Sequence, residues 1–158
     1  MLQIKIDLCH QNIPVKIIGG NSGITMGSAG ATHQAIEDIA IIKSLPNICV
    51  IAPGDPVEVQ CAIEASMALT SPCYIRITKN GEKPVHDANV SFQIGLAIPV
   101  HHGKQIAIIS TGNLLNTAIA IKNLALVHNF DIGIYSMHTV KPIDKELIRR
   151  LVNKYEII

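Results

Sequence analysis

His33 is the residue whose type and surroundings most strongly indicate chemistry. It lies in the segment GSAGATHQAIED, from Gly27 to Asp38, where a glycine-rich loop leads into a helix-like pattern. A histidine can donate, accept or shuttle a proton near neutral pH, and glycines let the backbone approach a ligand closely. The free N–H groups at a helix start point toward the same place. The segment therefore predicts a substrate site at His33, against the alternative of a histidine that caps a helix.

Two further polar residues follow apolar runs that have the length of buried strands. Arg76 lies in CYIRI, residues 73–77, and Asn21 follows VKIIGG, residues 15–20. A guanidinium keeps its charge and offers paired donors that match the oxygens of a phosphate. For Arg76 the alternative is an edge arginine paired with a surface acid. For Asn21 it is a turn residue that tolerates unusual backbone angles.

The remaining candidate ligands are weaker. The four cysteines form no CxxC pair and lie in apolar contexts, so we expect buried free thiols and no metal site. His101 and His102 have no third ligand nearby in sequence and are expected in a solvated turn. STGN, residues 110–113, is expected to be an ordinary tight turn, and His138 and Lys141 are expected to be packing or interface residues.

Alternating strand and helix patterns must position these side chains. The first half predicts strands at 15–20, 48–53 and 73–77, with helices at 33–44 and 54–69 between them. Asp55 is placed to cap the second helix, with Pro56 at its first position and Glu58 in a capping box. The order strand–helix–strand–helix–strand indicates a parallel sheet with crossover helices.

The pattern restarts after a polar segment. Strands are expected at 105–110 and 131–137, helices at 114–128 and 143–154, and the start of another strand at 155–158. Asp144 is placed to cap the second of these helices. We therefore predict an α/β fold of two incomplete doubly wound, mainly parallel-sheet units joined by a linker. Their predicted bounds are residues 1–78, 79–92 and 93–158. Residues 1–12 have amphipathic helical character with no strand before them, so both ends are expected to be truncated.

Composition excludes several classes of function. The chain has 158 residues, 48% of them hydrophobic, and a net charge of +1. Neither a basic run nor an aromatic stacking platform is present, which argues against a nucleic-acid partner. No apolar run approaches the length of a membrane span, and the first residues alternate apolar and polar types, unlike a signal peptide. We expect a cytoplasmic protein without a membrane partner.

Four segments resemble the transketolase family in colinear order. They are HQNIPVKIIG, GATHQAIEDIAIIKSLPNICVIAPGDPVEVQCAIEAS, PCYIRI and MHTVKPID. The similarity covers essentially the whole chain. It indicates a partial pyrimidine-binding domain of thiamine-diphosphate enzymes followed by a partial transketolase C-terminal domain.

The resemblance implies transfer of a two-carbon ketol unit between sugar phosphates, with thiamine diphosphate and Mg²⁺ or Ca²⁺ as cofactors. It makes His33 the catalytic, substrate-facing histidine and Arg76 the residue that holds the sugar phosphate. Asn21 and Ala29 stand where many members have a substrate histidine and an aspartate, so the sugar specificity is expected to differ.

The resemblance also implies a partner. In the family the active site lies between two subunits, so we expect a homo-dimer or a companion subunit that carries the pyrophosphate-binding domain. The family's catalytic glutamate and the pyrophosphate and metal ligands match no residue of this chain. It is therefore expected to be inactive alone.

Alternatives remain at this level. One is a section like the beta subunit of a 2-oxo-acid dehydrogenase, although the Thr-His-Gln segment and Arg76 favour transketolase. Another is a non-catalytic interaction module or truncated remnant. An electron carrier of the flavodoxin type is disfavoured because no flavin phosphate loop is evident.

Overall fold

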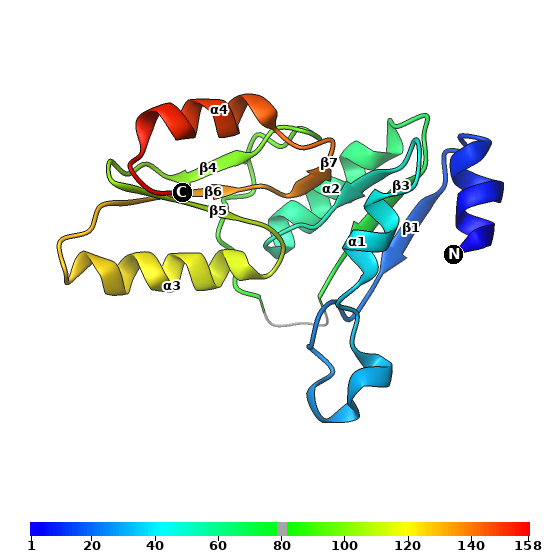
Figure 1. Cartoon of the computed structure of the whole chain (residues 1–158), viewed down its shortest axis with the longest axis horizontal. Helices are drawn as coiled ribbons and strands as arrows, with labels where there is room; N and C mark the ends of the chain where they lie inside the picture. The colour runs from blue at the N-terminus through cyan, green and yellow to red at the C-terminus, as the bar shows by residue number, and fades with distance from the viewer. Residues whose placement is uncertain (79–81) are drawn as a thin grey trace.

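The computed structural model describes residues 1–78 and 82–158 and has two β-sheets with helices on both faces (Figure 1). The α/β architecture predicted from the sequence is confirmed. The predicted linker, 79–92, starts in residues that lie outside the described part. Its described portion, 82–92, contains neither helix nor strand.

The first sheet is mainly parallel and has the strand order β1-β3-β2-β7. The strands are β1 (Lys16–Gly19), β3 (Cys73–Arg76), β2 (Cys49–Ile51) and β7 (Thr139–Lys141). The first three pair in parallel, as the crossover pattern predicts, whereas β7 pairs antiparallel with β2. The second half of the chain thus supplies an edge strand to the sheet of the first half.

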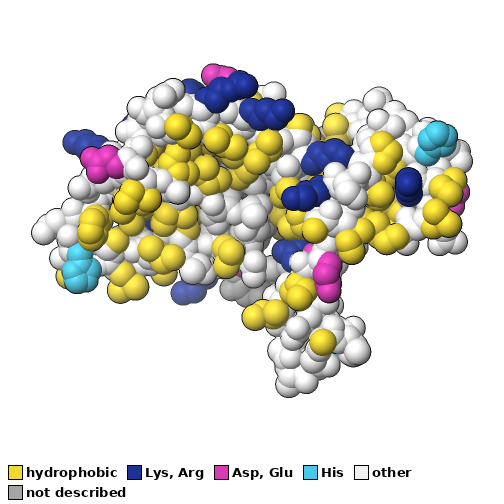
Figure 2. Space-filling view, viewed as in Figure 1, with side chains coloured by type: hydrophobic (Ala, Val, Ile, Leu, Met, Phe, Trp, Pro, Cys, Tyr) yellow, Lys and Arg dark blue, Asp and Glu magenta, His cyan; other side chains and the backbone are white. Residues whose placement is uncertain are grey.

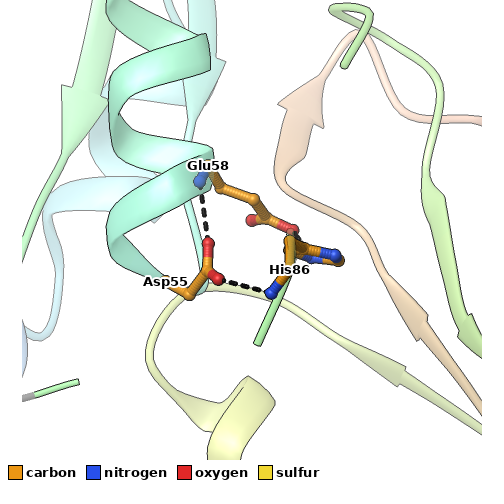
Figure 3. Close-up of side chains that lie close together, drawn as sticks. All are labelled: Asp55, Glu58 and His86. Atoms are coloured by element: carbon orange, nitrogen blue, oxygen red, sulfur yellow. Dashed lines mark hydrogen bonds and ion pairs between the residues drawn. The ribbon is translucent and has the colours of Figure 1, made fainter. Parts of the chain in front are cut away.

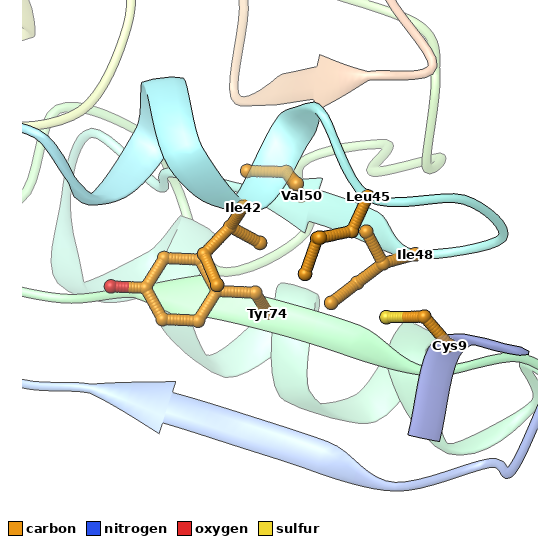
Figure 4. Close-up of a cluster of buried hydrophobic side chains, with 6 residues drawn as sticks. All are labelled: Cys9, Ile42, Leu45, Ile48, Val50 and Tyr74. Carbon is orange, nitrogen blue, oxygen red and sulfur yellow. The ribbon is translucent and has the colours of Figure 1, made fainter. Parts of the chain in front are cut away.

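Helices cover both faces of this sheet because its strands alternate their side chains between them. Val50 and Tyr74 pack with Ile42 of α1 (Asp38–Lys43). Cys9, from a short N-terminal π-helix (Ile4–His10), joins the same cluster (Figure 4). On the opposite face, Ala62 of α2 (Pro56–Met67) packs against the other residues of β2 and β3.

The second sheet is mixed, with the strand order β4-β6-β5. Its strands are β4 (Ile98–His101), β6 (Ile132–Ser136) and β5 (Ile106–Ser110). The β5–β6 pair is parallel and the β4–β6 pair antiparallel. Helices α3 (Leu114–Leu126) and α4 (Lys145–Lys154) lie on opposite faces (Figure 1).

Several predicted elements differ from those observed. The helix expected at 33–44 begins only at Asp38, because residues 27–33 form two single 3₁₀ turns and Gln34 is extended. The strand expected at 155–158 is reduced to one parallel bridge between Ile157 and Ile106. Strands β4 and β7 were not predicted. Both are short, contain or border proline, and lack an alternating pattern.

The N-cap predictions are confirmed, but Glu58 does not complete a capping box, because its carboxylate accepts from the Gly54 N–H and not from that of Asp55. The Asp55 carboxylate accepts a hydrogen bond from the Glu58 N–H at 2.7 Å, and Pro56 is the first residue of α2. Asp144 caps α4 in the same way, accepting from the Leu147 N–H at 2.8 Å. Both sites satisfy N–H groups that a helix start leaves unpaired.

Across residues 1–78 and 82–158, the helices are all too short or too polar to cross a membrane.

We predict that Asp144→Ala lowers the free energy of unfolding by about 2–4 kcal/mol, because it removes a helix cap and leaves a second N–H unpaired. The second oxygen of Asp144 accepts from the Ala97 N–H at 3.0 Å. Urea unfolding followed by circular dichroism measures the loss. Asp7→Ala, at an exposed position, is the control and should cost less than about 0.5 kcal/mol. Equal losses in the two variants would contradict this account.

Candidate functional site

The glycine-rich segment forms a closed loop that extends from the end of β1 to the start of α1 (Figure 1). Its neck is a two-residue antiparallel bridge in which Gly23 and Ala35 exchange two N–H···O bonds, each of 2.9 Å. Inside the loop, Gly27 and Gly30 have φ values of +50° and +79°. These are angles that residues with a Cβ rarely adopt, so the glycines are what let the loop turn.

His33 lies on this loop with its side chain exposed. Its Nδ1 is 3.0 Å from the Thr32 hydroxyl, which is its one side-chain hydrogen bond within residues 1–78 and 82–158. The alternative of a histidine that caps a helix start does not hold, because α1 begins five residues later. The ring is therefore free to meet a ligand at the surface. Its substrate role stays a prediction.

Arg76 fixes the neck of the loop. Its Nε donates to the Asp38 carboxylate at 2.8 Å, and one terminal nitrogen donates to the Ala35 carbonyl at 2.8 Å. The Tyr74 hydroxyl donates to the same Asp38 oxygen at 2.7 Å. The ion pair between Arg76 and Asp38 corresponds to the alternative role of Arg76 as a residue paired with an acid. It occupies part of the donors of the guanidinium group. A phosphate could use the other terminal nitrogen, so that role stays a prediction.

Asp38 is held in its charged form by these partners. Burial works against the charge, but the hydrogen bonds from Arg76 and Tyr74 outweigh it and lower the pKa of Asp38. Burial and the bond to Asp38 raise the pKa of Tyr74. Arg76 therefore faces a permanent negative charge, which positions its fork but weakens its attraction for a second anion.

Asn21 lies at the base of the same loop. It is exposed and has a φ of +58°, as expected for a turn residue with an unusual backbone angle. The next residue, Ser22, donates its N–H to the carbonyl of Ile77 at 3.2 Å. The structure thus brings Asn21 and Arg76 to one end of the first sheet. His33 and Ala29 lie further out on the loop, where Ala29 belongs to an exposed 3₁₀ turn.

A second polar cluster lies at the start of α2 and joins Asp55, Glu58 and His86 (Figure 3). Glu58 is fully buried; one of its oxygens accepts from the Gly54 N–H at 2.6 Å and the other lies 2.8 Å from the His86 Nε2. The second oxygen of Asp55 accepts from the N–H groups of Val85 and His86. The cluster therefore ties α2 to the segment that follows residues 79–81.

This cluster does not fit a metal ion or a metal-bound diphosphate. All four of its carboxylate oxygens already accept N–H donors, and His86 is committed to Glu58. A metal would have to displace those donors, including the N–H of Glu58 that Asp55 caps. It is the single group of three potential metal ligands within the described residues. The one such group among residues 1–78 and 82–158 is therefore not suited to hold a metal ion.

His138 closes the junction behind this cluster. Its ring is fully buried and stacks on Phe92 with centroids 4.0 Å apart. Burial lowers the pKa of His138. The neighbouring Thr139 hydroxyl accepts from the Gly95 N–H at 3.1 Å. His138 and Lys141 are packing residues, as predicted, and Lys141 donates to the carbonyls of Lys43 and Leu45.

The other weak candidates also have structural roles. His101 ends β4 and its Nδ1 lies 3.0 Å from the Ile132 carbonyl, whereas the neighbouring His102 is exposed as expected. In STGN, Gly112 has a φ of +60°, which confirms a tight turn. Its N–H donates to the carbonyl of Ala52 at the end of β2. All four cysteines are free thiols; Cys9, Cys49 and Cys73 are buried as predicted, whereas Cys61 is only partly buried.

Sequence reasoning missed Asp38, Tyr74 and His86. Tyr74 and Arg76 are two residues apart on one strand, so they point to the same face, and that spacing was an available signal. Asp38 had no such signal, because its partner Arg76 is 38 residues away in sequence. For His86 the sequence holds no signal, because its partner Glu58 is 28 residues away across a polar segment.

A cavity of about 230 Å³ opens beside the start of α2, and its lining includes Asp55, Ile77 and Glu82. Its acidic lining is unsuited to a phosphate. Neither His33 nor Arg76 is among the residues that line it. The candidate site is therefore the loop and its neck, not this cavity.

Large apolar side chains are exposed over much of the surface, and Figure 2 shows them gathered over both halves of the chain. One set lies on α3 and just beyond it, and the other near the N-terminus and on β1. Those more than about 40% exposed are Leu114, Ile121, Leu124, Leu126, Val127 and Phe130 in the first set, and Met1, Leu2, Ile6 and Ile18 in the second. Apolar exposure of this extent marks surfaces that bind partners.

Comparison with known proteins gives two family matches in colinear order. Residues 2–82 match the description "Transketolase, pyrimidine binding domain", and residues 95–158 match "Transketolase, C-terminal domain". A solved structure titled "Split gene transketolase, inactive beta4 tetramer" superposes with a TM-score of 0.89 at 25% identity. The match covers 99% of this chain and 50% of that one.

Two curated relatives add detail. A "Putative transketolase C-terminal section" of Methanocaldococcus jannaschii is 31% identical over 90% of this chain and 46% of its own length. A 1-deoxy-D-xylulose-5-phosphate synthase of Clostridium perfringens is 33% identical over 94% of this chain and 24% of its own length. The chain thus spans about half of the first relative and a quarter of the second.

We predict that stability decreases as the pH rises above about 6.5, through loss of the His86 charge. Burial disfavours the charge, but the hydrogen bond and charge of Glu58 outweigh it and raise the pKa of His86. When the pKa of a histidine is higher in the folded state than in the unfolded state, its charge stabilises the fold fully at a pH below the unfolded-state pKa. This stabilisation is lost as the pH rises through the folded-state pKa.

The measurement is the free energy of unfolding from about pH 6 to pH 9 for the wild type and for His86→Gln, which keeps a donor but cannot be charged. The variant should lose less stability over this range. Equal pH slopes in the two proteins would show that the pair carries no charge.

Proposed function

Because the chain belongs to the transketolase family, we propose that it is one component of a thiamine-diphosphate enzyme that transfers a two-carbon ketol unit between sugar phosphates. The observation that carries this is the colinear match to the pyrimidine-binding and C-terminal domains. The pyrimidine-binding domain belongs to enzymes that use thiamine diphosphate. The proposed units of this chain are residues 1–78 and 93–158, joined by 79–92.

In the proposed enzyme, the loop that carries His33 contributes the substrate side of the active site. The side chain of His33 is exposed, and its one hydrogen bond among the described residues is to its neighbour Thr32. It can therefore exchange a proton with a substrate hydroxyl or carbonyl. Arg76 holds the neck of the loop and offers its remaining donors to the sugar phosphate. Asn21, at the base of the loop, adds an amide to the same end of the sheet.

The pyrophosphate-binding domain, its metal ligands and the catalytic glutamate would come from a companion polypeptide or segment. The carboxylate oxygens of the Asp55–Glu58–His86 cluster already have hydrogen-bond donors and do not suit a metal, which supports metal ligands that come from elsewhere. The exposed apolar side chains of α3 and the N-terminal region also support this division, since they favour a partner or a second copy. The solved relative named as an inactive tetramer of β chains is consistent with a section that assembles with itself but lacks activity alone.

A second candidate reaction is the synthesis of 1-deoxy-D-xylulose 5-phosphate. It is favoured by the 33% identity to a synthase that shares the same two-domain section. A third alternative is a non-catalytic interaction module, which would form a complex with a partner but yield neither product.

We expect the pure chain with thiamine diphosphate and Mg²⁺ to show no ketol transfer from a ketose phosphate to an aldose phosphate. Co-expression with a polypeptide that carries a pyrophosphate-binding domain should restore it. The assay measures both transferase product and 1-deoxy-D-xylulose 5-phosphate, which separates the two reactions. Activity of the chain alone would overturn the division of labour. A stable complex without either product would favour the interaction module.

In the active assembly we expect His33→Ala to lower kcat/KM by about 10²–10⁴-fold without loss of stability, because the residue is exposed and acts in proton transfer. His102→Ala, at another exposed histidine outside the apolar surfaces, is the matched control and should leave kcat/KM unchanged.

Arg76→Lys should raise KM for the phosphorylated substrate, since an ammonium cannot serve Asp38, Ala35 and a phosphate together. An unphosphorylated substrate analogue tests this directly. If the same variant lowers activity equally for both substrates, Arg76 only fixes the loop.

A further inference from the structure

Cys49 and Cys73 are register partners on the adjacent parallel strands β2 and β3. Register partners on neighbouring strands point to the same face, and both side chains belong to the buried cluster under α2. Neighbouring strands lie about 4.8 Å apart, inside the Cα separation of about 4.4–6.8 Å that a disulfide spans. The spacing of the two strands therefore permits a disulfide between this pair.

The surroundings of the two sulfurs differ. Cys49 helps to line a largely apolar cavity of about 430 Å³, whose wall also contains Lys141, whereas Cys73 is fully buried behind it. Lys16 is the register partner of Cys73 on β1, so a positively charged residue lies beside the cysteine pair on the next strand. The neighbouring Cys73 thiol lowers the pKa of the Cys49 thiol, and Lys16 and Lys141 act in the same direction against burial.

The other cysteines lack this combination. Cys61 is more exposed than Cys49, but burial and the charges of Glu64, Asp55 and Glu58 raise its pKa. Burial likewise raises the pKa of Cys9, which packs in the cluster on the opposite face of the sheet. Thiolate character and access together set the reactivity of a cysteine.

We propose that Cys49 is a peroxide-reactive cysteine and that Cys73 is its resolving partner, so that the pair forms a reversible disulfide across β2 and β3. The Cys49 thiolate attacks one peroxide oxygen, the O–O bond breaks, and a sulfenic acid and hydroxide result. The sulfur of Cys73 then attacks the Cys49 sulfur and loses its proton as the S–O bond breaks. In total, two thiols are oxidised to a disulfide and one hydrogen peroxide is reduced. The two thiol protons combine with the two oxygens of the peroxide and its own hydrogens to give two waters.

The test uses the full chain and needs no companion, so its result is independent of the proposed ketol transfer. Dilute hydrogen peroxide is added to the reduced protein, and intact mass and peptide mapping follow the products with time. The wild type should lose two hydrogens, yield a linked peptide containing Cys49 and Cys73, and recover its mass with dithiothreitol. The cross-link should also raise Tm, because it restricts the unfolded chain.

Variants separate the two roles. Cys73→Ala should stop at a sulfenic acid on Cys49, which dimedone traps, whereas Cys49→Ala should remove the reaction. Cys61→Ser is the matched control and should oxidise like the wild type. Cys49 should react about tenfold faster than Cys61 although it is less exposed.

Modification of Cys61 first, absence of the linked peptide in the wild type, or equal oxidation of Cys49→Ala would overturn the proposal. The linked peptide is measured in the unaltered chain, so the test stands even if a core variant does not fold.

Discussion

Four buried carboxylate oxygens at the start of α2 hold the structure together. A buried charge is costly unless it is fully hydrogen-bonded, and here each oxygen of Asp55 and Glu58 has an N–H partner. Those partners come from the turn before α2, from α2 itself and from residues 85–86. The need to satisfy them fixes where the chain returns after residues 79–81, and so fixes the approach of the second half to the first.

The two halves are joined beyond this cluster. Strand β7 completes the first sheet, and the tight turn before α3 bonds to the end of β2. Gly54 has no room for a side chain, since a Cβ there would lie 2.8 Å from Leu115. His138, stacked on Phe92, fills the space between the halves. The resulting frame is continuous, and the His33 loop projects from one end of it (Figure 1).

In this arrangement, the residues that position the loop differ from the residue proposed to react. Arg76, Asp38 and Tyr74 fix the neck of the loop by short hydrogen bonds, while His33 stays free at the surface. A frame that positions an exposed group is what a site shared with a second polypeptide requires, because the rest of the site must approach from outside. The candidate substrate residues lie on this loop and at its neck, whereas the group of three potential metal ligands in the described part of the chain already has hydrogen-bond partners.

The sequence by itself determined the elements whose signals are local. The strands at β1, β2, β3, β5 and β6 were evident from apolar runs, and the caps at Asp55 and Asp144 from residue types at fixed offsets. The family and its loop were evident from motifs. Only the tertiary structure decided the place of β7, the commitment of Arg76 to Asp38, the His86–Glu58 pair and the facing thiols. Each of these joins residues far apart in sequence, and which partners meet depends on how strands order in a sheet, which local patterns do not specify.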